Sequence, residues 1–408
     1  MTTMLMSDKP HSSARVLMVA PQPFYEDRGT PIAIRHVLEA LSKAGYLVDL
    51  LTFSAGSDIS LPGLRILRVG GLFGIKNIPI GFSLKKLLLD VVMTFALLRK
   101  LRKPDYWCVH AVEEAVFPAL VIGRHRGVPV IYDMQSSLPD QLSGHPLFGT
   151  AIVQRFLQRC ERWALRHAAM VVGSAGLKPY VMRTEPGARV EEWNFPGQPH
   201  NPDPAQVAAR RHACEIADNA PVVLYSGNFA RYQGVESLIE AMPGVLAQVP
   251  DTVFVLIGGD RNSFSPDMRK AMEAVPQGSI RILPRQPRDA LPSFIAMADI
   301  LVSPRAGGDN LPLKVFDYIA AGKAIVATDY PIHRTILDES CAMLVEPRAE
   351  AIADGIVRLL QDPALARRLG AAARSRSETD YGLAPFQRFV DQVYRGVSGG
   401  GKLAARRP

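Results

Sequence analysis

Residues 300–327 are ILVSPRAGGDNLPLKVFDYIAAGKAIVA, and this stretch decides the fold. The apolar run at 300–302 leads into a glycine-rich turn, a helical stretch and a second apolar run at 324–327. Strand, helix and strand in this order form a crossover unit, which joins parallel strands of one sheet. The stretch therefore predicts an α/β domain with a parallel sheet.

The same alternation of short apolar strands and helices extends through both halves of the chain. Strands are predicted at 15–20, 47–53, 106–109, 128–132 and 170–172, and again at 222–225, 253–257, 280–283, 300–302 and 324–327. Residues 191–205 lie between the two sets and are rich in proline and turn residues, as linkers are. We therefore predict the α/β class and the GT-B arrangement of two facing Rossmann-like, doubly wound parallel-sheet domains. The domains are residues 1–195 and 196–384, followed by a crossover helix and a flexible basic tail at 385–408.

Composition limits the partners and the compartment. The chain has 408 residues, of which 48% are hydrophobic and 21% charged, as in ordinary globular proteins, and its net charge of +8 favours anionic partners. Its four cysteines are far apart in sequence, which argues against a zinc site or a disulfide framework and for a reducing compartment. Because residues 1–14 lack the apolar core of a secretion signal, we expect a cytoplasmic protein.

One segment, residues 84–101, has two interpretations. It is largely apolar, is interrupted by Asp90 and Thr94, and has lysines and arginines at both ends. It is too short and too polar to span a bilayer. It is either a helix packed on a sheet with solvated basic ends, or a helix that lies on an anionic membrane surface.

The ligand-binding motifs of several enzyme classes are missing. The first strand leads into PQPFYEDRG at 21–29, which is no dinucleotide-binding fingerprint, and the chain has neither a P-loop nor a D-x-D pair. A redox enzyme, a P-loop ATPase and a metal–diphosphate clamp are therefore disfavoured. An enzyme without such a metal has to neutralise a leaving diphosphate with cationic side chains and helix N-termini.

Residues 303–322 contain groups of this kind. A glycine-rich turn opens a helix that Asn310 can cap, with Pro312 in the first turn and Lys314 one turn in. Asp309 and Asp317 are about two turns apart, so they share a face of such a helix. Lysine and free backbone N–H groups suit phosphate, and carboxylates suit sugar hydroxyls. The alternative is an ordinary capped helix with a surface lysine.

Five segments together resemble glycosyltransferase family 4, the group 1 type of the GT-B fold. They are residues 28–41 (RGTPIAIRHVLEAL), 132–142 (YDMQSSLPDQL), 224–242 (LYSGNFARYQGVESLIEAM), 256–259 (LIGG) and 303–328. The resemblance covers nearly all of the chain. It implies transfer of a sugar from a nucleotide-sugar donor with retention at the anomeric carbon, without a cofactor and with no metal expected. It also implies an acceptor site in the first domain and a donor site in the second.

The resemblance assigns roles to donor-side residues. Asp309 and Asp317 occupy the ends of the family's E-x7-E motif, the first near the donor sugar and the second near the ribose. Lys314 would hold the diphosphate together with the backbone around Asn310 and Leu313.

Two loops complete the donor site that the resemblance implies. Gly29 lies where the donor phosphates would approach the first helix. The loop of Gly227 and Asn228 would border the nucleotide.

Several positions depart from the family pattern. Both glutamates of the E-x7-E motif are aspartates. The family's Arg and Lys, which stabilise the leaving diphosphate, are matched by Asn228 and Gln233, so Arg231, Lys314 or Arg305 has to substitute.

The acceptor side also departs from the pattern. Gln135 stands where the family has its catalytic-loop histidine, beside Asp133, and a glutamine binds a sugar hydroxyl but is neither an acid nor a base. His110, at a strand end with Glu113 and Glu114 nearby, is either a further acceptor-side residue or merely structural. His333 receives no role.

Three hypotheses follow. The first is a retaining glycosyltransferase that builds a cell-surface polysaccharide or glycolipid on a glycan or lipid-linked acceptor, peripherally at the inner face of a membrane. The second is a non-catalytic GT-B protein that binds a nucleotide or glycan and supports a partner enzyme. The third is another GT-B enzyme, an epimerase or a phosphorylase. Nucleic-acid binding is disfavoured because the basic residues are scattered and no recognised module is present.

Overall fold

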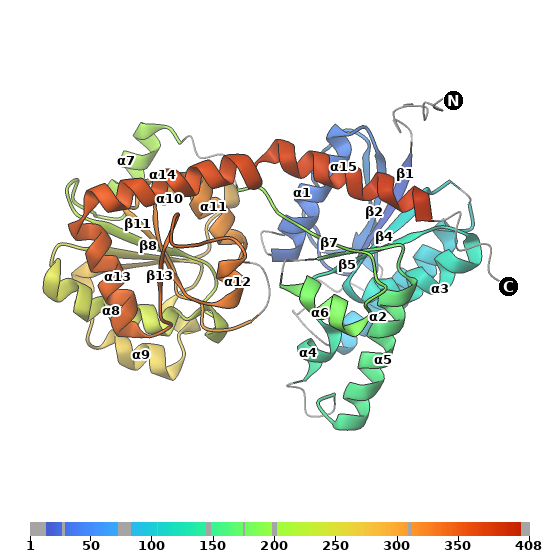
Figure 1. The fold of residues 1–408 in the computed structure, drawn as a ribbon, viewed down its shortest axis with the longest axis horizontal. Helices are drawn as coiled ribbons and strands as arrows, with labels where there is room; N and C mark the ends of the chain where they lie inside the picture. Colours follow the sequence, from blue (N-terminus) through green and yellow to red (C-terminus); the bar gives the residue numbers. More distant parts are fainter. Residues whose placement is uncertain are drawn as a thin grey trace, which may run out of the picture. The chain divides into compact units, whose positions relative to one another are not determined.

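The computed structural model divides the chain into two compact units. The first comprises Met1–Trp193 together with Phe386–Pro408, and the second is Asn194–Pro385 (Figure 1). The structure describes residues 14–26, 29–71, 83–103, 105–143, 148–173, 176–197, 202–308 and 312–400. The change from one unit to the other falls inside the turn-rich stretch 191–205.

The first unit is built on a sheet of seven parallel strands. In chain order they are β1 (Arg15–Ala20), β2 (Leu47–Phe53), β3 (Leu64–Val69), β4 (Cys108–Val112), β5 (Val130–Met134), β6 (Met170–Gly173) and β7 (Val190–Glu192). Their order in the sheet is β3-β2-β1-β4-β5-β6-β7, and every pairing is parallel. The strand order reverses between β1 and β4, which is where doubly wound sheets bind ligands.

The second unit repeats this plan with six parallel strands. They are β8 (Val222–Ser226), β9 (Val253–Ile257), β10 (Ile280–Leu283), β11 (Ile300–Ser303), β12 (Ala324–Thr328) and β13 (Met343–Val345). The order β10-β9-β8-β11-β12-β13 puts the reversal between β8 and β11. The predicted α/β fold of two Rossmann-like parallel-sheet domains is confirmed.

Helices connect the strands in both units. Those of the first unit are α1 (Gly29–Lys43), α2 (Leu84–Lys100), α3 (Val116–Arg126), α4 (Leu138–Leu142), α5 (Ala151–His167) and α6 (Leu177–Thr184). Those of the second are α7 (Pro204–Ala213), α8 (Val235–Gln248), α9 (Pro266–Met272), α10 (Leu291–Met297), α11 (Leu313–Ala321), α12 (Pro331–Arg334), α13 (Ala349–Gln361) and α14 (Pro363–Asp380). Because helices pack on the sheets, the central strands are buried and almost wholly apolar.

The last helix, α15 (Leu383–Gly400), starts in the second unit and packs on the first. Tyr394 is fully buried there, and its ring lies 5.8 Å from that of Tyr46. The Tyr46 hydroxyl donates to Asp391 of α15 at 3.0 Å. Phe386 lies against Trp193, with ring centroids 6.0 Å apart. The helix is thus an integral part of the first unit's core.

Local details differ from the sequence predictions at element ends. Strands β3, β7 and β13 were not predicted, and β7 lies partly within the stretch interpreted as linker. Helix α1 begins at Gly29, the first described residue after 27–28. Helix α11 has Pro312 as its N-cap, with ψ of 90°, so this proline lies just before the first turn and not within it.

Candidate active site

In the second unit, the start of α11 carries a lysine whose charged end points inward. Lys314 is the second residue of the helix, earlier than predicted. Its Nζ donates to Gln233 Oε1 at 2.8 Å and lies 4.0 Å from the centroid of the Tyr225 ring. Tyr225 is fully buried and Gln233 is 8% exposed. The ammonium is thus held by one amide oxygen and one aromatic face.

Gly227 makes room for this ammonium. It follows β8, has a φ of +152°, and a Cβ placed there would lie 2.6 Å from Lys314 Nζ and 2.8 Å from the Tyr225 hydroxyl. The amide of Gly227 donates to Ile257 at the end of β9, 2.9 Å away. A larger residue would displace the Lys314 ammonium or the Tyr225 hydroxyl, so this glycine is needed for both to keep their positions.

A second cation lies in the loop after β11. Arg305 is 2% exposed, and its Nε donates to the Gly307 carbonyl at 2.7 Å. Its guanidinium lies 5.3 Å from the ring centroid of Tyr232, which belongs to the loop after β8. The Ala306 amide donates to the Tyr232 carbonyl at 3.0 Å, which ties the two loops together. Both loops begin at the carboxyl ends of β8 and β11, the two strands between which the strand order reverses.

The charge of Arg305 makes the charged form of Lys314 less favourable. Burial lowers the pKa of Lys314 well below its ordinary value, and the charge of Arg305 lowers it further. Among the described residues, no carboxylate lies within ion-pair distance of Lys314. Two inward-facing cations next to a helix start, without an anionic partner for the lysine, make a site that favours an anion such as a diphosphate.

His333 holds together the two strand ends next to this site. It is fully buried; its Nδ1 donates to the Thr328 carbonyl at 2.8 Å, and its Nε2 accepts from the Ser303 hydroxyl at 2.9 Å. Burial lowers its pKa to about 4, and the charges of Arg305 and Lys314 add to that effect. It is therefore neutral at pH 7 and joins the ends of β11 and β12.

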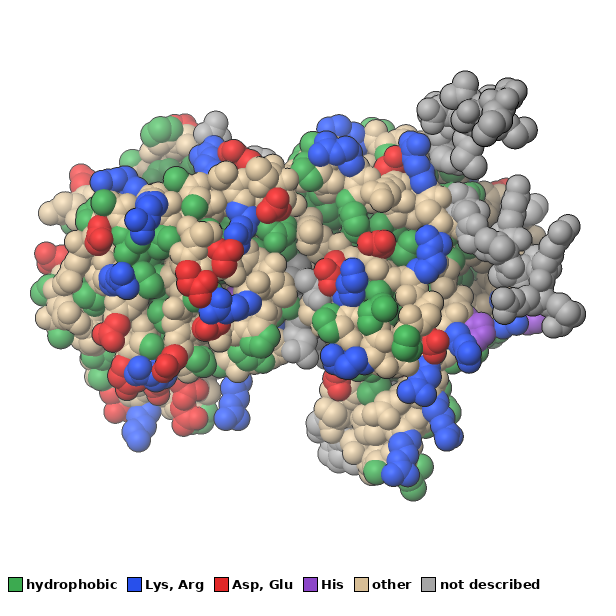
Figure 2. Space-filling model, viewed as in Figure 1, with side chains coloured by type: hydrophobic (Ala, Val, Ile, Leu, Met, Phe, Trp, Pro, Cys, Tyr) green, Lys and Arg blue, Asp and Glu red, His purple; other side chains and the backbone are tan. Residues whose placement is uncertain are grey.

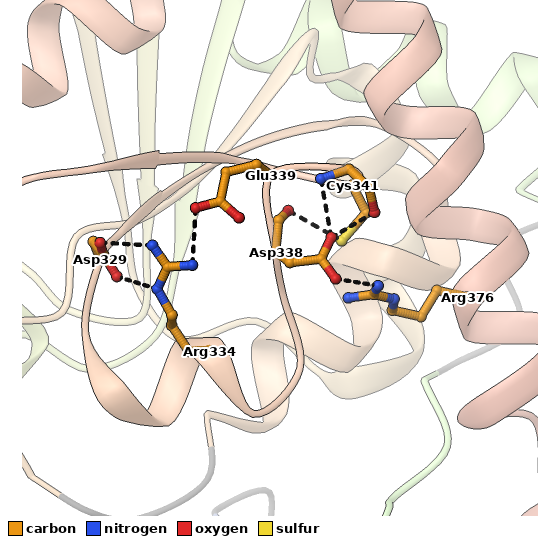
Figure 3. Close-up of polar contacts among 7 residues, drawn as sticks. Asp329, Arg334, Asp338, Glu339, Cys341 and Arg376 are labelled. Atoms are coloured by element: carbon orange, nitrogen blue, oxygen red, sulfur yellow. Dashed lines mark hydrogen bonds and ion pairs between the residues drawn. The ribbon is translucent and has the colours of Figure 1, made fainter.

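The segment that carries His333 is held by two sets of ion pairs (Figure 3). Arg334 donates to both oxygens of Asp329, at 2.6 and 2.8 Å, and also pairs with Glu339. Arg376 of α14 pairs with Asp338, whose pKa is lowered to about 2, first by the Ser340 hydroxyl and then by this arginine. Exposed pairs contribute little singly, but together they restrain the segment at both ends.

Of the two aspartates in the predicted E-x7-E motif, the structure describes Asp317. Asp317 is 6% exposed, and one of its oxygens lies 3.8 Å from a guanidinium nitrogen of Arg288. Arg288 follows β10, and sequence reasoning missed it because no local pattern links it to α11. Asp309 and Asn310 lie outside the described residues.

The other donor-side candidates lie at the same edge of the sheet. Asn228 is exposed; its carbonyl accepts from the Tyr225 hydroxyl at 2.6 Å, and its side chain accepts from the Ala230 amide at 3.1 Å. Arg231 is exposed in the 3₁₀ turn Arg231–Gln233, two residues before the partner of Lys314. Leu313 is the first residue of α11, so its N–H is one of the amides that a helix start leaves without a partner inside the helix.

In the first unit, the predicted acceptor-side residues form one hydrogen-bonded chain. Gln135 follows β5 and donates through Nε2 to Asp133 Oδ1 at 2.7 Å. Asp133 Oδ2 lies 3.2 Å from Nε2 of His110 in β4. Gln135 is partly exposed, whereas Asp133 is 1% exposed and His110 fully buried. Only Gln135 has surface with which to contact a substrate; His110 and Asp133 lie behind it.

The loop beyond Gln135 is anchored by another buried carboxylate. Glu161 of α5, fully buried, accepts from the Leu138 amide at 2.8 Å and from the hydroxyls of Ser137 and Tyr180. Burial raises the pKa of Glu161 despite these donors. The start of α4 is therefore fixed in place.

Two further residues of the first unit named in the sequence analysis are Gly29 and Glu113. Gly29, the first residue of α1, has open space around its Cα, so no neighbouring atom requires a glycine there. Glu113, just after β4, has a φ of 50° and a pKa raised to about 7, chiefly by burial and then by Glu114. Sequence reasoning noted Glu113 only as a neighbour of His110.

A cavity of about 360 Å³ in the second unit lies away from these groups. It is lined by residues at the starts of strands, among them Asp299 before β11 and Lys323 before β12. Lys314 and Arg305 are at the opposite edge of the sheet, so this cavity is separate from the cationic site. Within the described part of the chain, no three metal-ligating side chains come together.

Two family models match the chain, one in each unit. Residues 208–376 match the family described as "Glycosyl transferases group 1", and residues 28–177 match the "Glycosyl transferase 4-like domain". The chain belongs to the group 1 glycosyltransferases. The predicted family is confirmed, and with it the prediction of a glycosyltransferase.

Characterised relatives of this glycosyltransferase are enzymes of the same kind. It is 26% identical over 295 residues to the alpha-D-kanosaminyltransferase of Streptomyces kanamyceticus, covering 69% of this chain and 74% of the relative. It is 27% identical over 188 residues to the phosphatidyl-myo-inositol mannosyltransferase of Mycobacterium tuberculosis, covering 44% of this chain and 48% of the relative. The second match spans about half the length of that relative.

Solved structures support the fold of the glycosyltransferase. The sucrose-phosphate synthase of Thermosynechococcus elongatus superposes with a TM-score of 0.74 at 20% identity, over 95% of this chain and 99% of that one. HepE of Anabaena, solved in complex with UDP-glucose, superposes with a TM-score of 0.72 at 13% identity, over 93% and 99%. At these identities the likeness establishes the fold.

Proposed function

We propose that this glycosyltransferase binds the diphosphate of a nucleotide-sugar donor with Lys314, Arg305 and the start of α11, and that it needs no metal ion. The observation that carries the proposal is the inward-facing Lys314 ammonium, which among the described residues is held by Gln233 and the Tyr225 ring. A leaving diphosphate supplies the negative charge that this site lacks. Lysine and arginine then stabilise the departing anion, the task that a divalent cation performs in metal-dependent enzymes.

The family resemblance assigns the remaining donor contacts. Asp309 contacts the donor sugar and Asp317 the ribose, while the backbone N–H groups of Asn310 and Leu313 bind the phosphates. The loop of Gly227 and Asn228 borders the nucleotide, and the exposed Arg231 is long enough to reach the leaving group. These assignments rest on the family resemblance and on the positions of the described residues.

In the first unit, Gln135 hydrogen-bonds a sugar hydroxyl, and Gly29 leaves room for the phosphates at the start of α1. Because glutamine is neither an acid nor a base, proton transfer is left to the departing phosphate and the acceptor. The sugar is transferred with retention at the anomeric carbon. The acceptor is a glycan or a lipid-linked glycan of the cell surface.

We further propose that the enzyme lies peripherally on an anionic membrane at the cytoplasmic face. One face of α2 packs on the core through Leu89, Met93 and Leu97, and the other exposes apolar side chains, of which Phe95 is 68% exposed. None of the described helices meets the length and hydropathy that a bilayer span requires. A helix with this second apolar face and basic ends suits the membrane interface.

Helix α5 presents a similar surface. Ile152 is 81% exposed and Phe156 63% exposed, and four exposed arginines lie between and after them, at positions 155, 159, 162 and 166. On the face shown in Figure 2, basic and acidic side chains are interspersed over most of the surface, whereas basic ones prevail around α5. Anionic headgroups would pair with these arginines while the apolar side chains enter the interface.

The test of the donor site is nucleoside diphosphate release from UDP-, GDP-, ADP- and TDP-sugars, with and without EDTA. We expect release from one base class, unchanged by EDTA and abolished in Lys314→Met. Dependence on added Mg²⁺ would contradict the metal-free site. Binding of a nucleotide without turnover of any sugar conjugate would favour the non-catalytic alternative. NMR of the product's anomeric proton tests retention.

A further inference from the structure

A chain of hydrogen bonds runs from the C-terminal helix to Gln135. The Tyr394 hydroxyl of α15 lies 2.7 Å from His110 Nδ1, and the two rings are stacked, with 9° between their planes. His110 Nε2 contacts Asp133 Oδ2 at 3.2 Å, and Gln135 Nε2 contacts Asp133 Oδ1 at 2.7 Å. Tyr394 and His110 are 284 positions apart in sequence.

The direction of each hydrogen bond follows from the chemistry of Asp133. A carboxylate only accepts, so Nε2 of His110 carries a proton and donates to it. Nδ1 of the same ring then accepts from the Tyr394 hydroxyl. For the same reason the amide nitrogen of Gln135, and not its oxygen, faces Asp133. The chain therefore leaves Gln135 Oε1 pointing away from the carboxylate.

Burial shows where the chain ends. Tyr394 and His110 are fully buried, and Asp133 and Trp193 are each 1% exposed. Trp193 Nε1 adds a third donor to Asp133, at 3.4 Å. A carboxylate without water needs such donors, because an unpaired buried charge is very unfavourable. Only Gln135 is partly exposed, so the chain reaches the surface at this one side chain.

We propose that Tyr394 and His110 are positioning residues that fix the amide of Gln135, so that its oxygen is presented as the hydrogen-bond acceptor for a hydroxyl of the sugar substrate. This rests on the proposed role of Gln135 in sugar binding. Tyr394 belongs to α15, whose first residues are in the second unit. The orientation of Gln135 thus depends on the helix that continues from one unit into the other.

Removing one member of the chain weakens the hold on the others. Without the Tyr394 hydroxyl, Nδ1 of His110 loses its hydrogen-bond partner, and the ring is held in the chain by its contact with Asp133. The imidazole and the carboxylate can then shift together, and Gln135 is held by one fewer constraint. A Gln135 amide that follows a displaced carboxylate presents its oxygen in a less fixed position, and a hydroxyl bound by that oxygen is bound less well.

The experiment is a double-mutant cycle with Tyr394→Phe, Gln135→Ala and the double variant. The readouts are kcat and KM for nucleoside diphosphate release from the active nucleotide sugar, together with the Kd of the nucleoside diphosphate. We expect Tyr394→Phe to lower kcat by about 3- to 10-fold, the effect of one hydrogen bond, and to leave that Kd within about twofold. In the Gln135→Ala background it should have no further effect.

The matched control is Tyr46→Phe. It removes the Tyr46 hydroxyl, which bonds to Asp391 of the same helix, and keeps the Tyr46 ring against the Tyr394 ring. Tyr46 is not a member of the chain to Gln135. We expect wild-type kcat for it. If Tyr394→Phe does not fold, His110→Gln takes its place in the cycle, since an amide nitrogen still donates to Asp133 while the link to Tyr394 changes.

The outcomes separate this inference from the proposed function. If Tyr394→Phe lowers kcat equally in both Gln135 backgrounds, or leaves kcat unchanged, the positioning role is wrong. If Gln135→Ala alone retains full activity, the proposed sugar contact fails, whatever Tyr394 does. Loss of nucleotide binding in Lys314→Met tests the donor site of the second unit and is independent of both results.

Discussion

Replacing Lys314 by methionine separates a ligand-binding lysine from a structural one. Methionine has a similar length and no charge, so the apolar part of the side chain remains. The ammonium lost is the one 2.8 Å from Gln233 Oε1 and 4.0 Å from the Tyr225 ring centroid. A hydrogen bond from a charged group contributes about 1.5–3 kcal/mol to binding. The variant should therefore bind a nucleoside diphosphate about 10- to 150-fold more weakly.

The free energy of unfolding of the ligand-free protein should change little in Lys314→Met. The variant no longer desolvates an amine beside Arg305, which favours folding. It leaves the amide oxygen of Gln233, 8% exposed, without its donor, at a cost of about 1–3 kcal/mol. The two effects oppose each other, so we expect the free energy of unfolding to change by no more than about 1 kcal/mol.

Thermal unfolding with and without the nucleoside diphosphate measures both effects. At 100 times the wild-type Kd the ligand adds about 2.7 kcal/mol, which raises the midpoint of a unit of this size by about 5–10 °C. In Lys314→Met the same concentration should add only about 0.3–1.4 kcal/mol. Lys270→Met, which removes an exposed lysine of α9, is the charge-matched control. An undiminished ligand shift, or a free variant destabilised by more than about 3 kcal/mol, would refute the reasoning.

The affinity should also depend on pH in one direction. Burial and then Arg305 lower the pKa of Lys314 in the free protein. A bound diphosphate favours the ammonium and raises that pKa again, so binding takes up a proton. Affinity therefore falls as the pH rises through the window between the two values. Calorimetry in buffers of different ionisation enthalpy should detect this uptake in the wild type and not in Lys314→Met.

Three further outcomes are expected. Gly227→Ala should weaken nucleotide binding and lower the unfolding midpoint together, because its Cβ meets Lys314 Nζ at 2.6 Å. Gly29→Ala should leave the unfolding midpoint unchanged and lower donor affinity alone. Equal unfolding midpoints for the two variants would contradict this expectation. Because the pKa of folded His333 is about 4, below its ordinary 6.5, unfolding should become easier by about 3 kcal/mol as the pH falls between these values, and His333→Gln should lack this slope in acid titrations. Phe95→Ser should reduce cosedimentation with phosphatidylglycerol vesicles, and Met182→Ser on α6 should not; equal binding would argue against α2 as the membrane contact.

The sequence was sufficient to predict the central strands and the repetition of the fold. Buried parallel strands are almost continuously apolar, so β1, β2, β9 and β12 stand out in the sequence. The edge strands do not. In β3, Arg65 and Arg68 interrupt the apolar positions, and their pairing partners lie on β2 and in the loops that follow it. Strand β7 has three residues, two of them glutamates, and forms only because β6 provides a partner.

The candidate site was predictable where its parts are local in sequence. The glycine-rich turn and the start of α11 lie within residues 303–322, so Lys314 was identified from that stretch alone. Arg288, 29 positions before Asp317, approaches it only because β10 and the loop after it end beside α11. Likewise, nothing near His110 announces Tyr394. Such contacts depend on tertiary packing, which local periodicity does not encode.

The departures from the family pattern acquire a physical explanation once Gln233 and Lys314 are seen together. From the sequence, a glutamine at 233 is the loss of a cation that stabilises the leaving diphosphate. In the structure, its side-chain oxygen is the acceptor for the Lys314 ammonium, supplied by a helix 81 positions later. A lysine at 233 would bring a second ammonium close to the first, inside a site that Arg305 already makes positive, and the two would repel each other. The uncharged residue at 233 is therefore the condition for a cation at 314. With the proposed role of Lys314, the charge that stabilises the leaving diphosphate comes from the start of α11 in place of the loop after β8, and the unpaired amides of the helix add to it.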